Sequence, residues 1–149
     1  MIDQEEFINE RLKDEVISLV NAKFQRISIG IISQNIETLG AFLDKKPFKT
    51  PRQSSIRFNL ALEKLFPSRY SFLNRNGFLY KQLRSNFTHL NLDSRFLDFD
   101  FSENSNKHLK YIDGKTTIHL ESFLADYIAA CDKLIEFKNS GKVKEKNLA

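Results

Sequence analysis

The sequence predicts a mainly all-α protein: an up-and-down helical bundle of four to five helices, with a small β-hairpin inserted before the last helix. Apolar residues recur at steps of three and four along most of the chain, which is the period of an amphipathic helix. A chain of 149 residues with three prolines and five glycines also has few turn residues for a many-stranded β-sandwich. The hairpin is predicted by Asp113–Gly114, which separates two runs rich in β-forming residues.

The first third of the chain has the pattern of a helix. One apolar stripe covers residues 8–31 and a second covers 29–43. Acidic residues in the first turns suit the positive end of a helix dipole. The change of stripe near Ser28 and Gly30 indicates either two consecutive helices or one long bent helix, and the pattern leaves both open.

Further helices are predicted in the middle of the chain. Thr50–Pro51 is a typical helix start, with threonine as N-cap and proline at the first helical position, and this helix ends before Pro67. Residues 67–70 and 74–77 have the composition of turns. From about Gly77 another helix is indicated by apolar residues at steps of four, four and three, namely Leu79, Leu83, Phe87 and Leu90.

The last part of the chain combines the β segment with a closing helix. The β segment covers about residues 96–120, and the helix is predicted to follow as far as residue 137. Because the apolar period stops there, we expect 138–149 to be a frayed basic tail. Residues 1–137 are therefore predicted to form a single helical domain.

Composition and motifs exclude several classes of protein. The single cysteine, Cys131, excludes a disulfide framework and a Cys-x-x-Cys redox site, and its place on an apolar stripe predicts a buried thiol. The chain has no glycine-rich phosphate loop and no His-Glu-x-x-His motif, so we expect neither a metal nor a cofactor. His108 and His119 flank or lie within the predicted hairpin and are interpreted as surface or strand-edge residues. No apolar run approaches the ~20 residues that cross a bilayer, so a cytoplasmic protein without membrane contact is expected.

The charges are unevenly distributed along the chain. Between Lys45 and Arg84 there are ten basic residues and one acid, a net charge of +9, whereas the whole chain carries +4 and its remainder therefore carries −5. Such clustering predicts a basic face, for which a nucleic-acid backbone is the commonest polyanionic partner. The alternative is an ordinary solvated surface whose positive charge balances the negative charge of the acidic N-terminal helix, which has six acids between Asp3 and Glu15.

One pair of residues near the end of the helix that follows Gly77 is suited to chemistry. Arg84 can hold a phosphate through two hydrogen bonds, and His89 can move a proton near neutral pH. In a straight α-helix the two point about 140° apart, whereas Ser85 and His89 share a face. The alternatives are a solvated histidine beside an ordinary surface arginine, or an Arg84 that pairs across the bundle with an acid of residues 3–15.

Residues 83–90, Leu-Arg-Ser-Asn-Phe-Thr-His-Leu, resemble the Arg-x4-6-His motif of HEPN domains. These are small all-α domains found in prokaryotic toxin–antitoxin, abortive-infection and CRISPR-associated ribonucleases. Here serine follows the arginine where the family most often has asparagine. The resemblance implies a two-fold homodimer in which two copies of the motif form one RNA-cleaving site. It implies Arg84, Ser85 and His89 as catalytic residues, and it suggests RNA contacts from Arg75, Lys81 and Asn86.

Two functions of different classes are therefore predicted. The first is a HEPN-like, metal-independent endoribonuclease of a prokaryotic defence or toxin system, with an antitoxin as a further partner protein. In it Arg84 holds the scissile phosphate and His89 is the general acid or base. The alternative is a non-catalytic helical module, an antitoxin or a defence-complex subunit, that binds RNA or protein through the basic face.

Overall fold

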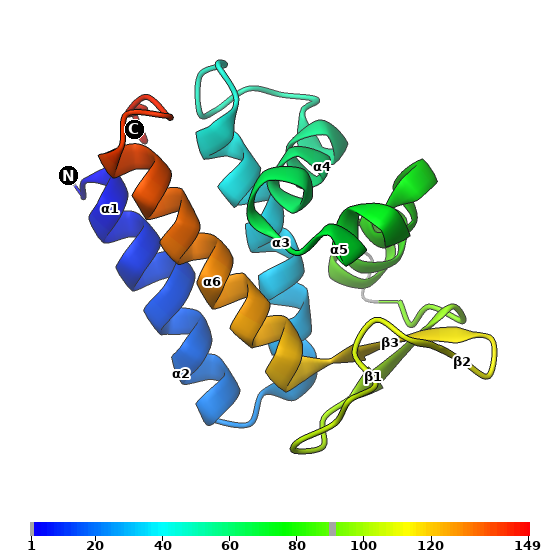
Figure 1. Cartoon of the computed structure of the whole chain (residues 1–149). Coiled ribbons are helices and arrows are strands. Elements are labelled where there is room, and N and C mark those ends of the chain that lie inside the picture. The colour runs from blue at the N-terminus through cyan, green and yellow to red at the C-terminus, as the bar shows by residue number, and fades with distance from the viewer. Residues whose placement is uncertain (1, 90–91) are drawn as a thin grey trace.

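The chain is mainly helical and carries a small three-stranded sheet before its last helix, which confirms the predicted fold class at that level (Figure 1). The computed structural model describes residues 2–89 and 92–149, apart from the side chains of residues 86, 88 and 89. Two of its helical segments, η1 and η3, are π-helices, and η2 is a short 3-10 helix. In chain order the elements are α1 (Gln4–Glu6), η1 (Phe7–Asp14), α2 (Glu15–Asn21), α3 (Gln25–Leu43), α4 (Ser54–Leu65), α5 (Ser68–Leu73), η2 (Arg75–Gly77), η3 (Tyr80–His89), β1 (Leu97–Asp100), β2 (Tyr111–Ile112), β3 (Lys115–His119) and α6 (Leu120–Asn139).

The elements α1, η1 and α2 follow one another as one continuous N-terminal helix. It is capped by Asp3, whose carboxylate accepts a hydrogen bond from the backbone N–H of Glu6 at 2.8 Å. It ends in a turn where Lys23 has a φ of +67°, a conformation that a right-handed helix cannot include. The first two helices are therefore separate. The apolar stripes placed the break near Ser28 and Gly30. In the structure the break comes a few residues earlier, and both of these residues lie inside α3.

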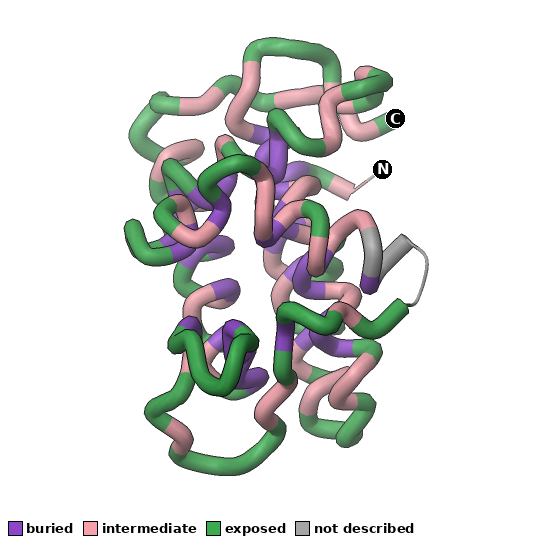
Figure 2. Tube along the Cα trace, turned by 90° about the vertical axis from the view of Figure 1, so that its right-hand side faces the viewer, coloured by how far each residue is buried: buried purple, intermediate pink, exposed green. Residues whose placement is uncertain are grey.

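The last helix, α6, runs antiparallel beside the N-terminal helix, so the two chain ends lie at the same end of the molecule (Figure 1). The hydroxyl of Tyr127 donates to the backbone carbonyl of Leu12 at 2.5 Å, and Lys13 pairs with Asp132 at 2.9 Å. Figure 2 shows the buried positions gathered where the helices face one another. The fully buried side chains come from all the long helices and include Ile8, Ile32, Ile36, Phe58 and Phe123.

The helices α3 and α4 touch at Gly40. A Cβ atom placed on Gly40 would lie 1.9 Å from the backbone carbonyl oxygen of Arg57, on α4, so only glycine fits there. At Gly30 the same atom would lie 3.4 Å from the ring of Phe87, on η3, which is a tight but far less severe contact. Gly40 therefore permits the close approach of α3 and α4.

The turn before α4 differs from the predicted helix start. The helix begins at Ser54 and not at Thr50. The hydroxyl of Thr50 donates back to the carbonyl of Pro47 at 2.5 Å, and Arg52 has a φ of +62°. These local contacts close a turn that excludes a helix over the same residues.

The short helix α5 occupies a segment for which only turns were predicted. Its six residues are too few to display an apolar period. It is anchored by one large buried side chain, Tyr70, whose ring packs against Phe66 and Phe123. Contacts with distant residues, and not a local pattern, define this helix.

The predicted hairpin is confirmed, and the sheet contains one further strand. β2 and β3 pair in antiparallel fashion, and Asp113 and Gly114 form the turn between them with φ values of 51° and 82°. β1 pairs with β3 in parallel, which gives the strand order β1-β3-β2. β3 is therefore the central strand, and its residues from Thr116 to His119 are buried.

Residues 138–149, expected to be a frayed basic tail, lie against the helices instead. The backbone N–H of Lys146 donates to the side chain of Gln4 at 2.9 Å. Its ammonium group donates to the carbonyl of Ala41 and to the carboxylate of Asp44, both at 2.6 Å. Val143 and Leu148 also pack against the core, but these polar contacts and two isolated apolar residues make no apolar period in the sequence.

Candidate functional site

Arg84 lies on η3 and forms an ion pair within its own chain. Its Nε donates to Oε2 of Glu37, on α3, at 2.7 Å. The hydroxyl of Ser54, on α4, donates to the other carboxylate oxygen of Glu37 at 2.6 Å. The side chains of Arg84 and Glu37 are 20% and 24% exposed. The arginine thus pairs across the helices, but with an acid of α3 and not with one of residues 3–15.

The ion pair uses one position of the guanidinium group of Arg84. Arginine presents several N–H donors in a planar fork. Within the part of the chain that the structure describes, neither Nη group of Arg84 has a hydrogen-bond partner. Glu37 therefore offsets part of the positive charge, holds the direction of the group, and leaves its two amino groups for a ligand.

The backbone of η3 changes the expected relation between positions 84 and 89. Because η3 is a π-helix, its hydrogen bonds join residues five apart, whereas those of an α-helix join residues four apart. Positions 84 and 89 are five apart. The angle between their directions around the helix axis is therefore smaller than the angle of about 140° in a straight α-helix. The side chains of Asn86 and His89 lie outside the described residues, and the roles predicted for them stay predictions.

The other predicted site residues are divided between two places. Ser85 is half-buried next to Arg84 on η3, and Lys81 is exposed near the start of the same helix. Arg75 is exposed on η2, where its guanidinium carbon lies 4.5 Å from the centre of the ring of Phe72, on α5. The structure therefore keeps Arg84 and Ser85 together, whereas Arg75 belongs to a cluster around α5.

The predicted basic stretch is divided by the fold. Two of its ten basic side chains, Arg57 and Arg84, form ion pairs with acids of the same chain. The other eight are exposed, and α4, a helix of 12 residues that is about 18 Å long, separates them along the chain into two groups. They are Lys45, Lys46, Lys49 and Arg52 before α4, and Lys64, Arg69, Arg75 and Lys81 from its last turn onwards.

Arg57 is buried and holds the loop between α3 and α4. Its Nε donates to Asp44 at 2.7 Å, and its Nη groups donate to the carbonyls of Pro47 and Phe48 at 2.9 Å and 2.7 Å. Burial opposes the ionisation of Asp44, but hydrogen bonds from Arg57 and Lys146 outweigh it and hold the pKa of Asp44 below its ordinary value. All three nitrogens of this buried guanidinium are thus engaged within the chain, so Arg57 is a structural residue and not a candidate for binding an RNA phosphate.

The chain matches no protein-family model, no curated protein and no solved structure. Across residues 2–89 and 92–149, no helix is long and apolar enough to cross a membrane. In the same ranges no three His, Cys, Asp or Glu side chains are grouped so as to hold a metal ion. The function must therefore be inferred from the geometry of the chain itself.

A partly buried polar cluster that the sequence did not indicate joins the sheet to the helices. The hydroxyl of Tyr70, on α5, donates to Asp126, on α6, at 2.6 Å and lies 2.7 Å from Nε2 of His108. The backbone N–H of His119 donates to Nδ1 of His108 at 3.0 Å. A neutral His108 therefore carries its proton on Nε2 and donates it to Tyr70. The result is one chain of hydrogen bonds from β3 to α6.

Both histidines of this cluster are more buried than the predicted surface or strand-edge positions. His119 is 1% exposed, and its ring contacts the hydroxyl of Ser122 and the carbonyl of Ser102, each at 2.7 Å. Burial, together with the neighbouring His119, lowers the pKa of His108 to about 4. The prediction was wrong because the parallel strand β1 makes β3 central, and a hairpin pattern alone cannot reveal a third strand.

This cluster fits a structural role. Burial, and to a lesser extent Asp126, raise the pKa of Tyr70, so that its hydroxyl remains a hydrogen-bond donor. His108 is neutral near neutral pH because its pKa is low. Neither Tyr70 nor His108 is therefore suited to exchange protons with a substrate near neutral pH. Instead, the cluster fastens the sheet to α5 and α6.

Cys131 is fully buried on α6, as predicted. Burial raises the pKa of its thiol to about 12. A neutral, enclosed thiol packs as a small apolar side chain and does not act as a nucleophile.

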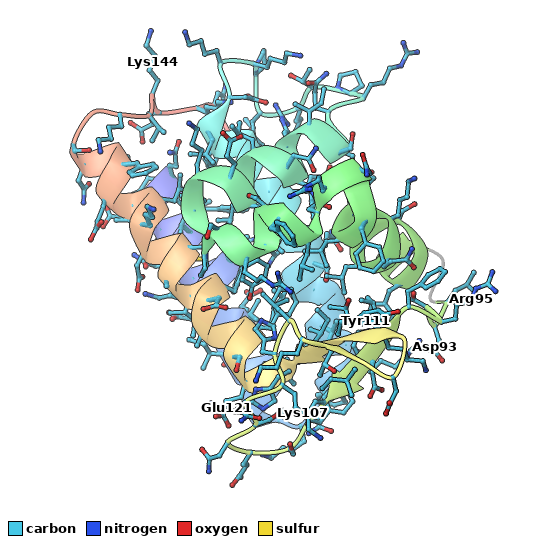
Figure 3. The ribbon with its side chains drawn as sticks, turned by 45° about the vertical axis from the view of Figure 1, so that its right-hand side comes forward. Asp93, Arg95, Lys107, Tyr111, Glu121 and Lys144 are labelled. Atoms are coloured by element: carbon cyan, nitrogen blue, oxygen red, sulfur yellow. The ribbon has the colours of Figure 1, made fainter. Side chains whose placement is uncertain are left out.

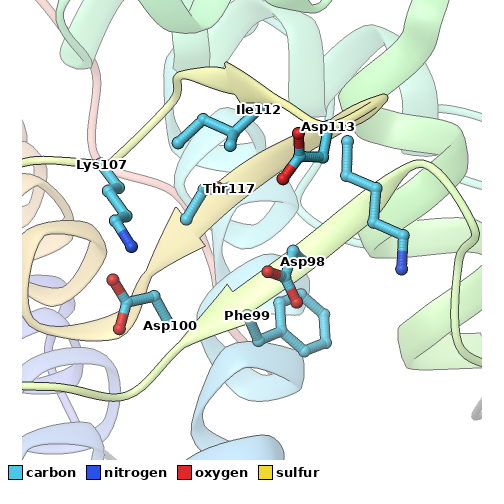
Figure 4. Close-up of a pocket in the computed structure, with 8 residues that line it drawn as sticks. Asp98, Phe99, Asp100, Lys107, Ile112, Asp113 and Thr117 are labelled. Carbon is cyan, nitrogen blue, oxygen red and sulfur yellow. The ribbon is translucent and has the colours of Figure 1, made fainter.

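A hollow with a volume of about 460 Å³ lies along one side of the sheet (Figure 4). Figure 4 shows the ammonium group of Lys107 directed toward Asp100. Hydrogen bonds from Ser102 lower the pKa of Asp100, so this carboxylate is ionised. The lining has three aspartates against two lysines, a formal charge of −1, so the hollow does not favour an anion such as a phosphate. Its charged lining residues are Asp98, Asp100, Asp113, Lys107 and Lys115.

Proposed function

We propose that this chain is a HEPN-like, metal-independent endoribonuclease of a prokaryotic defence or toxin system. The observation that carries the proposal is the state of Arg84, which Glu37 orients through Nε while both Nη groups are left for a ligand. Such a guanidinium binds a phosphate through two hydrogen bonds and stabilises the charge that develops on it. The place of His89, five residues on in a π-helix, supports the pairing of a phosphate-binding group with a proton-transfer group.

The proposed reaction proceeds with the groups of RNA itself. The 2′-hydroxyl oxygen attacks the adjacent phosphorus, the bond from phosphorus to the 5′-oxygen breaks, and a 2′,3′-cyclic phosphate forms. His89 of one copy accepts the proton of the 2′-hydroxyl, and a protonated His89 of the second copy gives a proton to the departing 5′-oxygen. Ser85 donates a hydrogen bond at the phosphate beside Arg84. Arg75, Lys81 and Asn86 hold the flanking RNA.

The proposal includes the finer architecture and the assembly. It requires an up-and-down bundle of four to five helices and a two-fold homodimer that brings two motifs to one site. α3 and α6 both run antiparallel to the N-terminal helix (Figure 1), which supports the bundle. A cytoplasmic location and an antitoxin as protein partner complete the proposed function.

The test is cleavage of single-stranded RNA by the purified chain in the presence of EDTA. Arg84→Lys keeps a cation for Glu37 but removes the planar fork, and His89→Ala removes the proton-transfer group. Each is expected to lower the cleavage rate by about 100-fold or more. Arg11→Ala, an exposed arginine on the N-terminal helix, is the control and retains activity. Undiminished cleavage in both site variants would contradict the assignment.

A non-catalytic RNA- or protein-binding module is the second candidate, and the ion pair of Arg84 within one chain favours it. Glu37 offsets the charge of Arg84, and only a fifth of the arginine side chain is exposed. This is typical of an arginine that mainly joins helices. A module of this kind retains RNA in a salt-dependent manner and yields no cleavage product. RNA binding without a cleavage product in the same assay would favour the non-catalytic module over the endoribonuclease.

A further inference from the structure

Arginine and aromatic side chains form an exposed cluster on α5 and η2. Phe72, near the end of α5, is 51% exposed. The guanidinium carbon of Arg69 lies 5.0 Å from the centre of its ring, and that of Arg75 lies 4.5 Å from the same point. We call these three residues the Phe72 platform.

The local structure explains why the platform forms. Arg69 and Phe72 are three residues apart on α5 and therefore share one side of the helix. Arg75 approaches from η2, because the chain turns at Asn74. The side chain of Asn74 is buried and accepts a hydrogen bond from the backbone N–H of Tyr80 at 2.9 Å, which fixes that turn. Both arginines are thus placed by ordered backbone.

The charge around the platform is entirely positive in the local sequence. From Lys64 to Leu92 the chain has five basic residues and no acid. Among the described residues, neither Arg69 nor Arg75 forms a salt bridge with a carboxylate. Two like charges beside one ring repel each other. An anion bound between them would remove that repulsion, so the cluster is suited to a polyanionic ligand.

A second arginine–phenylalanine pair lies beside Phe78, the residue that follows η2. Phe78 comes directly after η2, and its ring lies 6.5 Å from that of Phe96. Phe96 is 46% exposed, and the guanidinium carbon of Arg95 lies 5.4 Å from its centre. Figure 3 shows Arg95 reaching outward from the molecule. The same combination of an open ring and a cation therefore occurs twice.

We propose that the Phe72 platform binds single-stranded RNA, with an unpaired base stacked on Phe72 and the neighbouring phosphates held by Arg69 and Arg75. An exposed ring among arginines is how many proteins hold unpaired bases. A duplex hides the faces of its bases, and an acidic protein surface would leave the ring without a stacking partner. The choice of RNA rests on the proposed function, whereas the stacking site rests on the contacts described above.

The experiment measures binding of the full chain to a short, fluorescently labelled single-stranded RNA by anisotropy. The RNA is methylated at its 2′-oxygens, so that 2′-hydroxyl attack cannot cleave it and binding is measured apart from catalysis. Phe72→Leu removes the aromatic face but keeps an apolar side chain, and affinity is expected to fall about tenfold. Arg69→Gln and Arg75→Gln each weaken binding and reduce the slope of log affinity against log salt by about 0.7.

The control variant removes the same charge beside another ring. Lys142 lies 5.0 Å from the centre of the ring of Phe137, beyond the end of α6. Lys142→Gln is expected to leave the affinity unchanged, because that cluster is not part of the platform. Duplex RNA is the second control, and it is expected to bind more weakly than the single strand.

Two results would overturn the platform: wild-type affinity in Phe72→Leu, or an equal loss of affinity in Lys142→Gln. Equal binding of duplex RNA would also overturn it, since stacking on unpaired bases would then not be required. The outcome for catalysis is separate and uses unmodified RNA. Platform-dependent binding without cleavage contradicts only the endoribonuclease, whereas cleavage with an affinity that does not depend on Phe72 contradicts only the platform.

Discussion

The Nε atom of Arg84 lies 2.7 Å from Oε2 of Glu37, so an ion pair joins η3 to α3 within one chain. The residue that we propose to bind a phosphate therefore also joins two helices. Substitutions at this position affect stability as well as any activity, and the two effects have to be measured separately.

Arg84→Ala is expected to lower the free energy of unfolding by about 1–2 kcal/mol, between the values typical of exposed and of buried pairs. The loss arises because Glu37 keeps its charge without a counter-ion. Urea denaturation of Arg84→Ala, Glu37→Gln and the double variant measures the coupling. The double variant should be less destabilised than the sum of the two single ones, and strict additivity would show that the ion pair contributes nothing.

The two glycines of α3 should respond differently to the same substitution. Gly40→Ala forces a Cβ atom against the backbone of α4 and is expected to cost about 1–3 kcal/mol or more. Gly30→Ala meets only the edge of the Phe87 ring, and the better helix propensity of alanine offsets much of the strain, so its effect stays within about 1 kcal/mol. Thermal unfolding of both variants tests this, and an equal loss would contradict the close approach at Gly40.

The buried cluster around His108 predicts a pH dependence of stability. The pKa of His108 falls from about 6.5 in the unfolded chain to about 4 in the folded one. The unfolded chain therefore binds more protons between these values, and stability falls as the pH drops through this window. Between about pH 7 and about pH 5 the expected loss is about 2 kcal/mol.

The variant His108→Gln separates this effect from other titrating groups. It is less stable near neutral pH because the bonds to Tyr70 and to the backbone of His119 are disturbed. Its stability should nevertheless change less between about pH 7 and about pH 5 than that of the wild type, as measured by urea denaturation at both pH values. An identical slope in the two proteins would exclude His108 as the source.

The C-terminal tail is expected to stabilise the fold through one lysine. Lys146→Ala removes the bonds to Asp44 and to the carbonyl of Ala41 and should cost about 1–3 kcal/mol. Because the pKa of Asp44 is lowered in the fold, the contribution of its ion pairs is present above about pH 4 and is lost as the pH falls further. Lys144→Ala, an exposed neighbour (Figure 3), should change stability by less than about 0.5 kcal/mol. Equal effects of the two variants would mean that the tail is not docked.

Local patterns were sufficient for the elements that depend on neighbouring residues. The turn at Asp113–Gly114 and the closing helix were predicted because turn conformation and apolar period act over a few residues. The β segment was predicted from about residue 96, but the parallel pairing of β1 with β3 and the helix α5 were not, because both depend on distant contacts. Tyr70, for example, is anchored by Asp126, 56 positions away.

The candidate sites show the same division. Arg84 is a candidate on the strength of its local motif, whereas Glu37, 47 positions earlier, carries no signal that marks it as the partner of Arg84. The spacing of Arg69, Phe72 and Arg75 was visible in the sequence. It predicts no cluster by itself, because the segment has the composition of turns. Residues three apart share one side of a helix, but not of a turn.

The order of residues alone was enough to assign the mainly helical class, the hairpin, the buried Cys131 and the uneven charge, because these follow from periodicity, turn chemistry and simple counts. Which charges remain available to a ligand was decided only by the folded chain. Folding buries Arg57 against Asp44, pairs only the Nε atom of Arg84 with Glu37, and leaves Arg69 and Arg75 at the half-exposed ring of Phe72. The physical reason is that electrostatic interaction depends on separation in space and not on separation along the chain.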